Sequence, residues 1–353
     1  MTSNLWYHIQ NASDLDTPAL VVYPDRIKEN IKILIDNIAD VNQLRPHIKT
    51  HKSAEVTAMM LQAGIKKFKC ATIAEAEMLG KAGAPNVLLA YQPVGPKATR
   101  FASLVKQFPQ TKWSCLIDNT GSAQHLSAVF EESGKPIDVY IDLNVGMNRT
   151  GILVADALKL FQECSALKGI AIVGLHVYDG HLRDRDFTTR KKRCDEAFDT
   201  IKKLQDDILK SSGRKLTIVA GGTPTYSIHS KRKEMECSPG TYIYWDRGYE
   251  LLLQEQKYQH AALVVTRVIS KPAEGIICLD LGHKAIAAEN PISDRVYFLN
   301  APELQPIGHS EEHMVFKTNG EKDYNVGDVL YGVPFHVCPT VALHDIAYAV
   351  VDH

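Results

Sequence analysis

Two histidines, two lysines and an arginine lie within eight residues, RPHIKTHK at 45–52. If the segment around Leu44–Ile48 is a strand, alternation puts four polar side chains on one face: Arg45, His47, Lys49 and His51. Burial lowers the pKa of a lysine, and a neutral lysine is the nucleophile that forms a Schiff base with a carbonyl. Lys52 has the opposite parity, so Lys49 is the better candidate. The alternative is a solvated, inert basic strand end.

A second candidate site lies near the other end of the chain, in FHVCPTVALH at 335–344. His336 and Cys338 are two residues apart, so on a strand both side chains leave the same face. One imidazole and one thiolate suit zinc and leave coordination positions open for water or substrate. From these two residues alone, a buried cysteine beside a surface histidine is the commoner arrangement.

Two glycine loops are candidate phosphate sites. In VAGGTPTY, a strand leads through Gly221, Gly222 and Thr223 into a predicted helix, which presents N–H groups and a hydroxyl to a phosphate. In ECSPGTY, a second loop contains Gly240, Thr241 and Tyr242. Phosphate sites of β/α barrels often follow the last two strands, so two late loops of this kind support the interpretation.

Two other strand ends carry reactive or anion-binding side chains. In LNVGMNRTG, the guanidinium of Arg149 can bind an anionic oxygen. In HVYDGH, Tyr178 and His181 are candidate acid–base groups, and Asp179 can orient a partner. Taken alone, the first segment is more often an ordinary turn, and histidines in a segment like the second are more often structural.

The elements that must position these residues alternate between short apolar runs and amphipathic runs, from about Thr17 to Val219. Strands are predicted near 44–48, 67–71, 86–90, 113–117, 137–143, 170–177 and 216–220. Helices are predicted near 53–63, 74–82, 122–133, 155–167 and 186–209. Apolar strands that alternate with helices indicate a parallel sheet, and this number of units favours a TIM-like (β/α)8 barrel.

After about Tyr258 the pattern changes to short strand-like runs separated by turn residues. We expect a barrel over 18–257 and a smaller all-β domain over 258–353, joined by part of 1–17. The N-terminal residues lack a secretory pattern, and no stretch is apolar for long enough to span a membrane. A net charge of −1 argues against binding to nucleic acid or an anionic membrane, and seven scattered cysteines favour a reducing cytoplasm.

Taken together, TPALVVY, RPHIKTHK, GMNRTG, YDGH, GGTP, SPGTY and the late HVCPT resemble the D-threonine aldolase and D-serine dehydratase family. These are pyridoxal-phosphate enzymes of the alanine-racemase-like fold type, and the resemblance covers nearly the whole chain. It implies that Lys49 binds the cofactor aldehyde, Arg149 contacts the cofactor's phenolic oxygen, and His181 is a base near the substrate. It also implies that His336 and Cys338 bind a divalent metal. The expected cofactor-binding set is completed by His47, Tyr178, Gly221, Gly222, Thr223, Gly240, Thr241 and Tyr242.

The function implied by the resemblance is a pyridoxal-phosphate and metal-dependent lyase that cleaves D-3-hydroxy amino acids to glycine and an aldehyde. A D-serine or D-3-hydroxyaspartate dehydratase is the near alternative, in which Lys49 removes the Cα proton. An amino-acid racemase and a non-catalytic pyridoxal-phosphate-binding protein are further alternatives. The metal is expected to be zinc or manganese, and the thiolate of Cys338 favours zinc. A cytoplasmic homodimer with a small D-amino acid substrate is expected.

Overall fold

The computed structural model describes residues 5–351, which form two compact units. One unit combines residues up to Ile31 with residues from Thr241 onward, and the other contains Lys32–Gly240. The division falls within helix α1 (Pro24–Asp36). Residues 1–4 and 352–353, which the predicted β domain includes, lie outside the described part of the chain.

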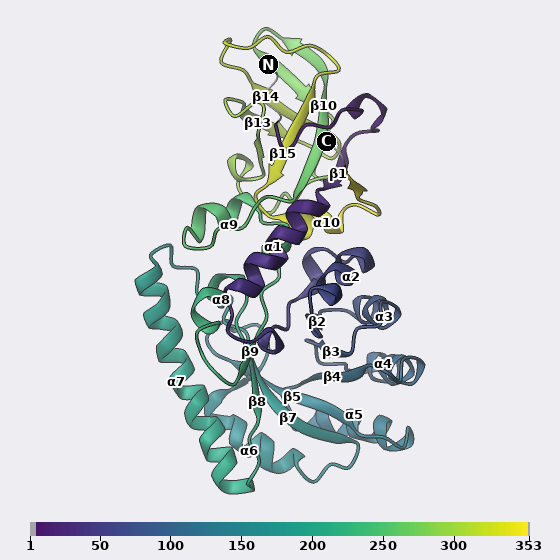
Figure 1. The fold of residues 1–353 in the computed structure, drawn as a ribbon, viewed down its shortest axis with the longest axis vertical. Coiled ribbons are helices and arrows are strands. Elements are labelled where there is room, and N and C mark those ends of the chain that lie inside the picture. The colour runs from purple at the N-terminus through teal and green to yellow at the C-terminus, as the bar shows by residue number, and fades with distance from the viewer. Residues whose placement is uncertain (1–4, 352–353) are drawn as a thin grey trace. The chain divides into compact units, whose positions relative to one another are not determined.

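The unit Lys32–Gly240 is a parallel sheet whose strands alternate with helices along the chain (Figure 1). Its spatial strand order is β2-β3-β4-β5-β7-β8-β9, with β6 (Ile152–Leu153) beside β5. The strands are β2 (Lys67–Cys70), β3 (Asn86–Leu89), β4 (Lys112–Ile117), β5 (Ile137–Asn144), β7 (Ile170–Val177), β8 (Thr217–Ala220) and β9 (Met235–Cys237). The helices are α2 (Ala54–Gln62), α3 (Ile73–Lys81), α4 (Pro96–Gln107), α5 (Thr120–Glu132), α6 (Val154–Cys164), α7 (Phe187–Ser212) and α8 (Thr223–His229).

The segment 44–47 joins the two ends of this sheet. Leu44 forms a parallel bridge with Cys237 of β9, and His47 forms one with Lys69 of β2. The N–H of Arg45 donates to the carbonyl of Cys237 at 2.8 Å, and the N–H of Lys69 donates to the carbonyl of Pro46 at 2.9 Å. This segment therefore takes the eighth strand position, and the predicted β/α barrel is confirmed.

Side-chain caps start four of the barrel helices at the positions that the sequence signals. Ser53, Thr72, Asn119 and Asp186 each accept a hydrogen bond from the N–H three residues later. Such caps satisfy N–H groups that have no partner inside the helix. Inside the barrel, Leu88, Leu116, Tyr140 and Val219 from four strands form a buried apolar cluster.

The strand predicted through Ile48 ends earlier than expected. Ile48–Thr50 form a 3-10 helix, η3, and Nδ1 of His47 accepts the N–H of Lys49 at 3.2 Å. That N–H is therefore not available to a neighbouring strand. Strand parity correctly places the side chain of Arg45 in the interior. Lys49, in contrast, lies in the helical turn η3, so the prediction that Lys49 shares a strand face with Arg45 is wrong.

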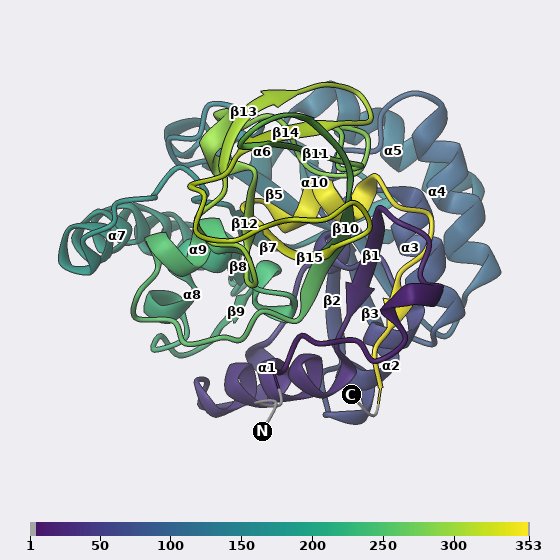
Figure 2. The same ribbon diagram turned by 90° about the horizontal axis from the view of Figure 1, so that it is seen from above.

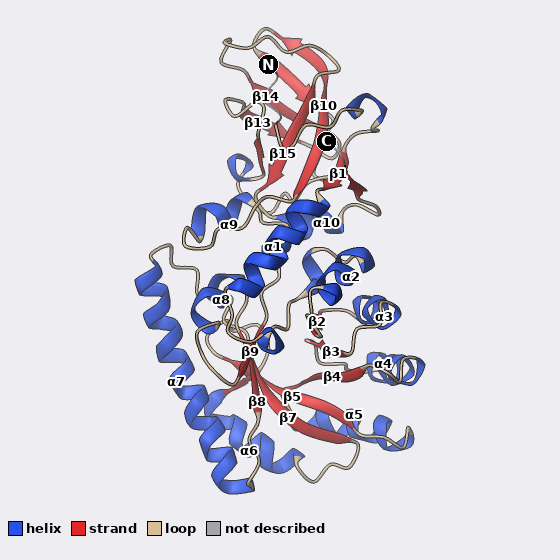
Figure 3. Cartoon of the chain, in the orientation of Figure 1, coloured by secondary structure: helices blue, strands red, loops and turns tan. Residues whose placement is uncertain are grey.

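The other unit is an antiparallel sheet in the order β12-β15-β10-β11-β14-β13, and β1 pairs with β10 and β16 (Figures 2 and 3). Its strands are β1 (Ala19–Val22), β10 (Ala262–Ala273), β11 (Ile276–Leu279), β12 (Val296–Phe298), β13 (Gln305–His309), β14 (Met314–Lys317), β15 (Val329–Pro334) and β16 (Tyr348–Ala349). The short helices α9 (Arg247–Leu252) and α10 (Val337–Ala342) belong to the same unit. The predicted all-β architecture is confirmed.

The N-terminal segment supplies part of the core of this unit. Tyr7, Ile9 and Tyr23 pack with residues of β10 and β15 in one buried cluster. The hydroxyl of Tyr23 donates to the carbonyl of Tyr7 at 2.7 Å, which fixes the segment against β1.

Among the helices of residues 5–351, none is both long enough and apolar enough to cross a membrane.

The His336–Cys338 segment does not lie on a strand, so that prediction is wrong. His336 is the N-cap of α10, and Cys338 is in the first helical turn. Pro339 follows, and proline is tolerated there because the first-turn N–H groups have no intrahelical partner. The buried carboxylate of Asp246 accepts the N–H of Val337 at 3.1 Å and fixes the start of the helix.

Candidate active site

Three cationic side chains surround the ring of Tyr178 at the end of β7. Arg149 Cζ lies 5.1 Å from the ring centroid, Lys69 Nζ 5.7 Å and Lys49 Nζ 5.9 Å. Lys49 comes from η3, Arg149 from the loop after β5, and Lys69 from β2. Because carboxyl ends of parallel strands meet at one mouth of a barrel, residues far apart in sequence converge here. The result is a positively charged, aromatic-lined site suited to a planar anionic group.

The predicted phosphate loop packs directly beneath Tyr178. A Cβ at Gly222 would lie 2.9 Å from Cε2 of Tyr178, so only glycine lets the ring approach this backbone. The N–H of Gly240 donates to the hydroxyl of Thr223 at 3.2 Å, which brings the two glycine loops together. The predicted residues Gly221, Gly222, Thr223 and Gly240 thus form one structure beside Tyr178.

His181 lies against the loop that carries Arg149. A Cβ at Gly146 would lie 2.8 Å from Nε2 of His181. Nδ1 of His181 is buried and has no hydrogen-bond partner among the described residues. A buried polar atom without a partner is costly, so this nitrogen is well suited to contact a bound molecule.

A chain of three buried polar residues, which the sequence reasoning missed, leads away from the same ring. Lys69 Nζ lies 3.3 Å from Nε2 of His176, and Nδ1 of His176 lies 2.7 Å from Asp142. Burial, with the charge of Lys49, lowers the pKa of Lys69 to about 7. Burial raises the pKa of Asp142, but the hydrogen bond and charge of His176 outweigh this effect and lower it. The sequence signal that could have revealed this chain is the presence of three polar residues within otherwise apolar barrel strands.

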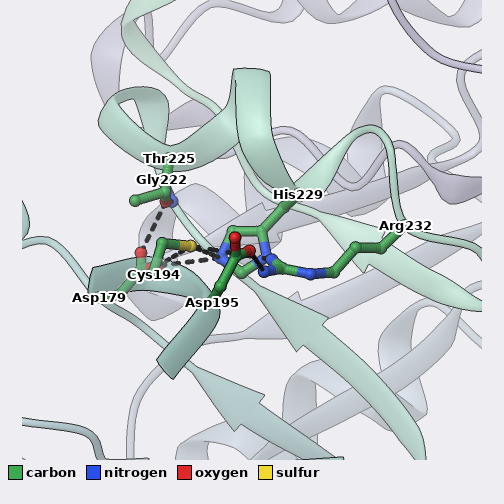
Figure 4. Close-up of polar contacts among 7 residues, drawn as sticks. All are labelled: Asp179, Cys194, Asp195, Gly222, Thr225, His229 and Arg232. Carbon is green, nitrogen blue, oxygen red and sulfur yellow. Dashed lines mark hydrogen bonds and ion pairs between the residues drawn. The ribbon is translucent and has the colours of Figure 1, made fainter. Parts of the chain in front are cut away.

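Asp179 organises a second buried network, which includes Gly222 and Thr225 of the predicted phosphate loop (Figure 4). Its carboxylate accepts the hydroxyl of Thr225 at 2.7 Å and lies 2.8 Å from Nε2 of His229. The N–H of Gly222 donates to the Thr225 hydroxyl at 3.4 Å. The sequence suggested that Asp179 orients a partner, and these contacts link its carboxylate through Thr225 to the backbone of Gly222 in the predicted phosphate loop.

Asp179, Cys194 and His229 present three potential metal ligands within a small buried volume. However, Arg232 donates to Nδ1 of His229, so Nε2 carries the imidazole proton and donates to Asp179. A metal on Nε2 would require the opposite tautomer, with a proton on Nδ1 facing the guanidinium. Burial, followed by the charge of Asp179, also raises the pKa of the Cys194 thiol to about 12. The cluster therefore favours hydrogen bonding over metal binding.

The predicted metal ligands lie in the other unit and contact each other. His336 hydrogen-bonds both Cys338 and Glu289, and these contacts raise its pKa to about 9 although burial alone would lower it. Glu289 was not predicted, and no spacing motif links it to His336. Cys338 Sγ lies 3.8 Å from the hydroxyl of Thr241, a predicted cup residue of this unit. An imidazole backed by a carboxylate and paired with a thiol is a donor set that fits a divalent metal.

The barrel residues also fit pyridoxal phosphate. A lysine amine, an arginine, an aromatic ring and a glycine cradle converge, and His181 offers an unsatisfied nitrogen.

His47 uses its Nδ1 to cap η3 and thereby positions Lys49. Tyr242 is buried in the unit that contains the antiparallel sheet, not in the barrel unit. Lys52 is more exposed and lies 3.9 Å from Glu75, outside the cation group around Tyr178.

This fold and site define a pyridoxal-phosphate-type barrel with an appended β domain. The chain belongs to the family described as alanine racemase, N-terminal domain, whose model matches residues 22–248. A second model, described as "Putative serine dehydratase domain", matches residues 261–350. The resemblance to the D-threonine aldolase and D-serine dehydratase family is thereby confirmed.

Individual relatives agree with this assignment. The chain is 29% identical over 350 residues to a D-threonine aldolase of Arthrobacter sp, covering 96% of this chain and 90% of the relative. It is 27% identical over 248 residues to the D-threo-3-hydroxyaspartate dehydratase of Delftia sp., covering 66% and 62%. The crystal structure of D-threonine aldolase from Filomicrobium marinum superposes with a TM-score of 0.86 at 28% identity, covering 94% and 90%. The chain is accordingly a lyase of this family.

Proposed function

We propose that this protein is a pyridoxal-phosphate and divalent-metal-dependent lyase of the D-threonine aldolase type. Its reaction cleaves the Cα–Cβ bond of a D-3-hydroxy amino acid to give glycine and an aldehyde. The observation that carries the proposal is the grouping of Lys49 and Arg149 around Tyr178, in a chain that also holds the His336–Cys338 pair. The two aldolase similarities support the choice of bond.

The barrel residues have separate tasks in holding the cofactor. Pyridoxal phosphate supplies an electron sink for the substrate carbon when it is bound. Lys49 provides the amine that anchors the aldehyde, and Arg149 offers its guanidinium to an anionic oxygen. The backbone of Gly222 and the hydroxyl of Thr223 are suited to bind the phosphate. Tyr178 provides an aromatic surface and excludes water from one side.

The residues proposed for chemistry at a hydroxyl are His181 in the barrel unit and the His336–Cys338 pair in the other unit. His336 and Cys338 would hold the divalent metal, which would supply Lewis-acid chemistry that favours an ionised hydroxyl. His181 removes the hydroxyl proton, and the oxygen electrons form the aldehyde carbonyl as the Cα–Cβ bond breaks. The electron pair of that bond remains on the Cα side, where a proton completes glycine. The thiolate ligand favours zinc over manganese.

A dehydratase is the second candidate, because a dehydratase is also among the relatives and the same residues serve both outcomes. Incubation with D-threonine, D-serine and D-threo-3-hydroxyaspartate separates the two. Glycine with an aldehyde supports the aldolase proposal. A keto acid with ammonia and no glycine would replace it by the dehydratase. Turnover that survives complete metal removal would contradict the role of His336 and Cys338, and racemisation of alanine alone would favour a racemase.

We also propose that the protein works as a cytoplasmic homodimer. The sequence-based domain bounds, a barrel over 18–257 and a β domain over 258–353 joined by part of 1–17, stay a prediction. The support for the dimer is family resemblance. Analytical ultracentrifugation of the holoenzyme tests it, and a single species of monomer mass would contradict it. Domain boundaries can be tested by limited proteolysis, where a first cut near residue 257 supports the division.

A further inference from the structure

We propose that Lys69, His176 and Asp142 form a buried proton relay, with Lys69 as a second acid–base amine of the Lys49 pocket. This inference rests on the proposed function for its role in turnover, but the relay itself can be tested without cofactor or substrate. No motif in the sequence marks Lys69, and its side chain is only 3% exposed.

The relay runs through the barrel interior. Lys69 is on β2, His176 on β7, and three strands, β3, β4 and β5, separate these two in the sheet. A contact of 3.3 Å between their side chains therefore crosses the inside of the barrel. Lys69 also lies 5.7 Å from the ring centroid of Tyr178, and Lys49 lies 5.9 Å from the same centroid. The inner end of the relay thus faces the proposed cofactor site.

Hydrogen bonding fixes the direction in which His176 can pass a proton. Asp142 accepts at 2.7 Å from Nδ1 of His176, so Nδ1 carries the proton and Nε2 presents its lone pair to Lys69. Asp142 is further satisfied by Gln92, whose amide donates to it at 2.9 Å. When the Lys69 ammonium gives a proton to Nε2, His176 becomes an imidazolium beside a carboxylate, and Lys69 becomes a neutral amine. No charge is created and no bond to carbon changes in this step.

The charges around Lys69 leave its proton loosely held. Among the described residues, no carboxylate lies within ion-pair distance of its Nζ, and its hydrogen-bond partner is an imidazole. The charged groups that influence it are Lys49 and Arg45, which disfavour the ammonium, and Asp142 and Asp179, which favour it. The pKa of Lys69 is lowered to about 7, first by burial, so both protonation forms are populated near neutral pH.

The nearby Lys67 shows what a purely structural lysine looks like in this strand. Lys67 has the same strand parity as Lys69, but its Nζ is 2.5 Å from a carboxylate oxygen of Glu236. The ammonium of Lys67 therefore faces a carboxylate across the ion pair. Lys69 has no such pair, which is the arrangement expected of a group that must gain and lose a proton during turnover.

The outer end of the relay connects to the mouth of the barrel. The Gln92 amide that donates to Asp142 also donates to Asp118 at 2.9 Å, and Asp118 accepts the N–H of Gly151 at 3.2 Å. Asp118 is only half-buried, so the network links Lys69 to a position that solvent reaches. The loop ending at Gly151 carries Arg149, which contacts Tyr178.

The first test measures lysine titration in the cofactor-free protein by NMR of labelled side-chain Cε and Nζ. We expect one lysine to titrate near pH 7 and its signal to be missing in both Lys69→Met and Lys69→Arg. Asp142→Asn should move this titration to lower pH, because a negative charge that favours the ammonium is lost. Lys67→Arg should leave it in place. If no lysine titrates below about pH 9, or if the Asp142 variant moves the titration upward, the relay is wrong.

The second test uses the holoenzyme and the pH profile of kcat with D-threonine. Lys69→Met should lower kcat by about 10²–10⁴-fold, the usual contribution of an acid–base group, with little change in KM. Lys69→Arg should not restore it, because arginine holds its proton, whereas Lys67→Arg should behave as wild type. An unaltered kcat in a Lys69→Met variant that retains its visible cofactor band overturns the role in turnover. If wild-type protein turns over no D-3-hydroxy amino acid, the proposed function fails while the NMR result still decides the relay.

Discussion

The imidazole of His336 hydrogen-bonds the carboxylate of Glu289 through Nδ1, and this contact orients the ring at the start of α10. A carboxylate on one ring nitrogen leaves the other nitrogen free for a metal and increases its basicity. Cys338 hydrogen-bonds the same imidazole, so the thiol and the ring of His336 lie in contact with each other. Glu289 is therefore suited to orient the proposed metal ligand His336, although no sequence motif includes it.

Glu289→Gln should weaken zinc binding by roughly 10–100-fold, because the charge that stabilises the metal-bound imidazole is lost. Competition with a chromophoric chelator measures this affinity directly. The matched control is Glu312→Gln, since Glu312 is an exposed carboxylate that pairs with Lys284 instead. Equal zinc affinities for wild type and Glu289→Gln would show that the contact does not orient the ligand.

Lys49→Ala should abolish the imine-type visible absorbance of the purified protein. The expected cause is loss of the amine that anchors pyridoxal phosphate beside Tyr178. Absorbance spectra before and after addition of pyridoxal phosphate provide the measurement, and circular dichroism checks the fold. A retained band would move the anchor to another lysine, with Lys69 tested first because it faces the same ring.

Gly146→Ala should reduce activity by displacing His181 while leaving the cofactor band intact. Gly146 has a φ of +118°, and its added Cβ would lie 2.8 Å from Nε2 of His181. Gly134→Ala is the matched control, because Gly134 has a φ of +75° and open space around its Cβ position. Both variants incur backbone strain, so only the difference between them reports on His181. Equal kcat values for the two variants would remove His181 from the proposed base role.

The sequence predicted the barrel because its strands are apolar on both faces, and helix starts such as Ser53 and Thr72 follow local capping rules. It predicted Arg149 and Tyr178 because each follows a strand, and strand ends meet at one mouth. These are properties of short segments. Such properties can be predicted without knowing which strands are neighbours.

The contacts that were missed depend on spatial arrangement instead. Lys69 meets His176 across the barrel interior, which a linear pattern cannot show. The Lys49 turn and the His336 cap were read as strands because alternation was extended past the strand end. In both places a side chain or buried carboxylate takes the backbone N–H, His47 in one case and Asp246 in the other. Whether a side chain takes a backbone N–H in place of a strand partner depends on the residues nearby and not on the periodicity of the sequence.

The buried pair of Arg45 and Glu236 offers a test of stability inside the barrel. Their closest atoms are 2.5 Å apart, and the side chains are 1% and 8% exposed. Glu236→Gln leaves the Arg45 charge without its partner, so the free energy of unfolding should fall by about 3–5 kcal/mol at pH 7. Urea unfolding of the cofactor-free protein measures the change. Asp25→Asn, in an exposed pair with Lys28, should leave the midpoint unchanged.

The same pair predicts how the difference between wild type and Glu236→Gln depends on pH. Burial raises the pKa of Glu236, but the charges of Arg45 and Lys67 outweigh it, and the pKa in the folded protein is below its ordinary value. The stabilisation is therefore fully present above the unfolded-state pKa, near 4.3, and is lost as pH falls through the lower folded-state pKa. We expect the two proteins to converge in stability as the pH is lowered below about 4. A difference that grows on acidification would show that Glu236 is held in its protonated form by the barrel interior.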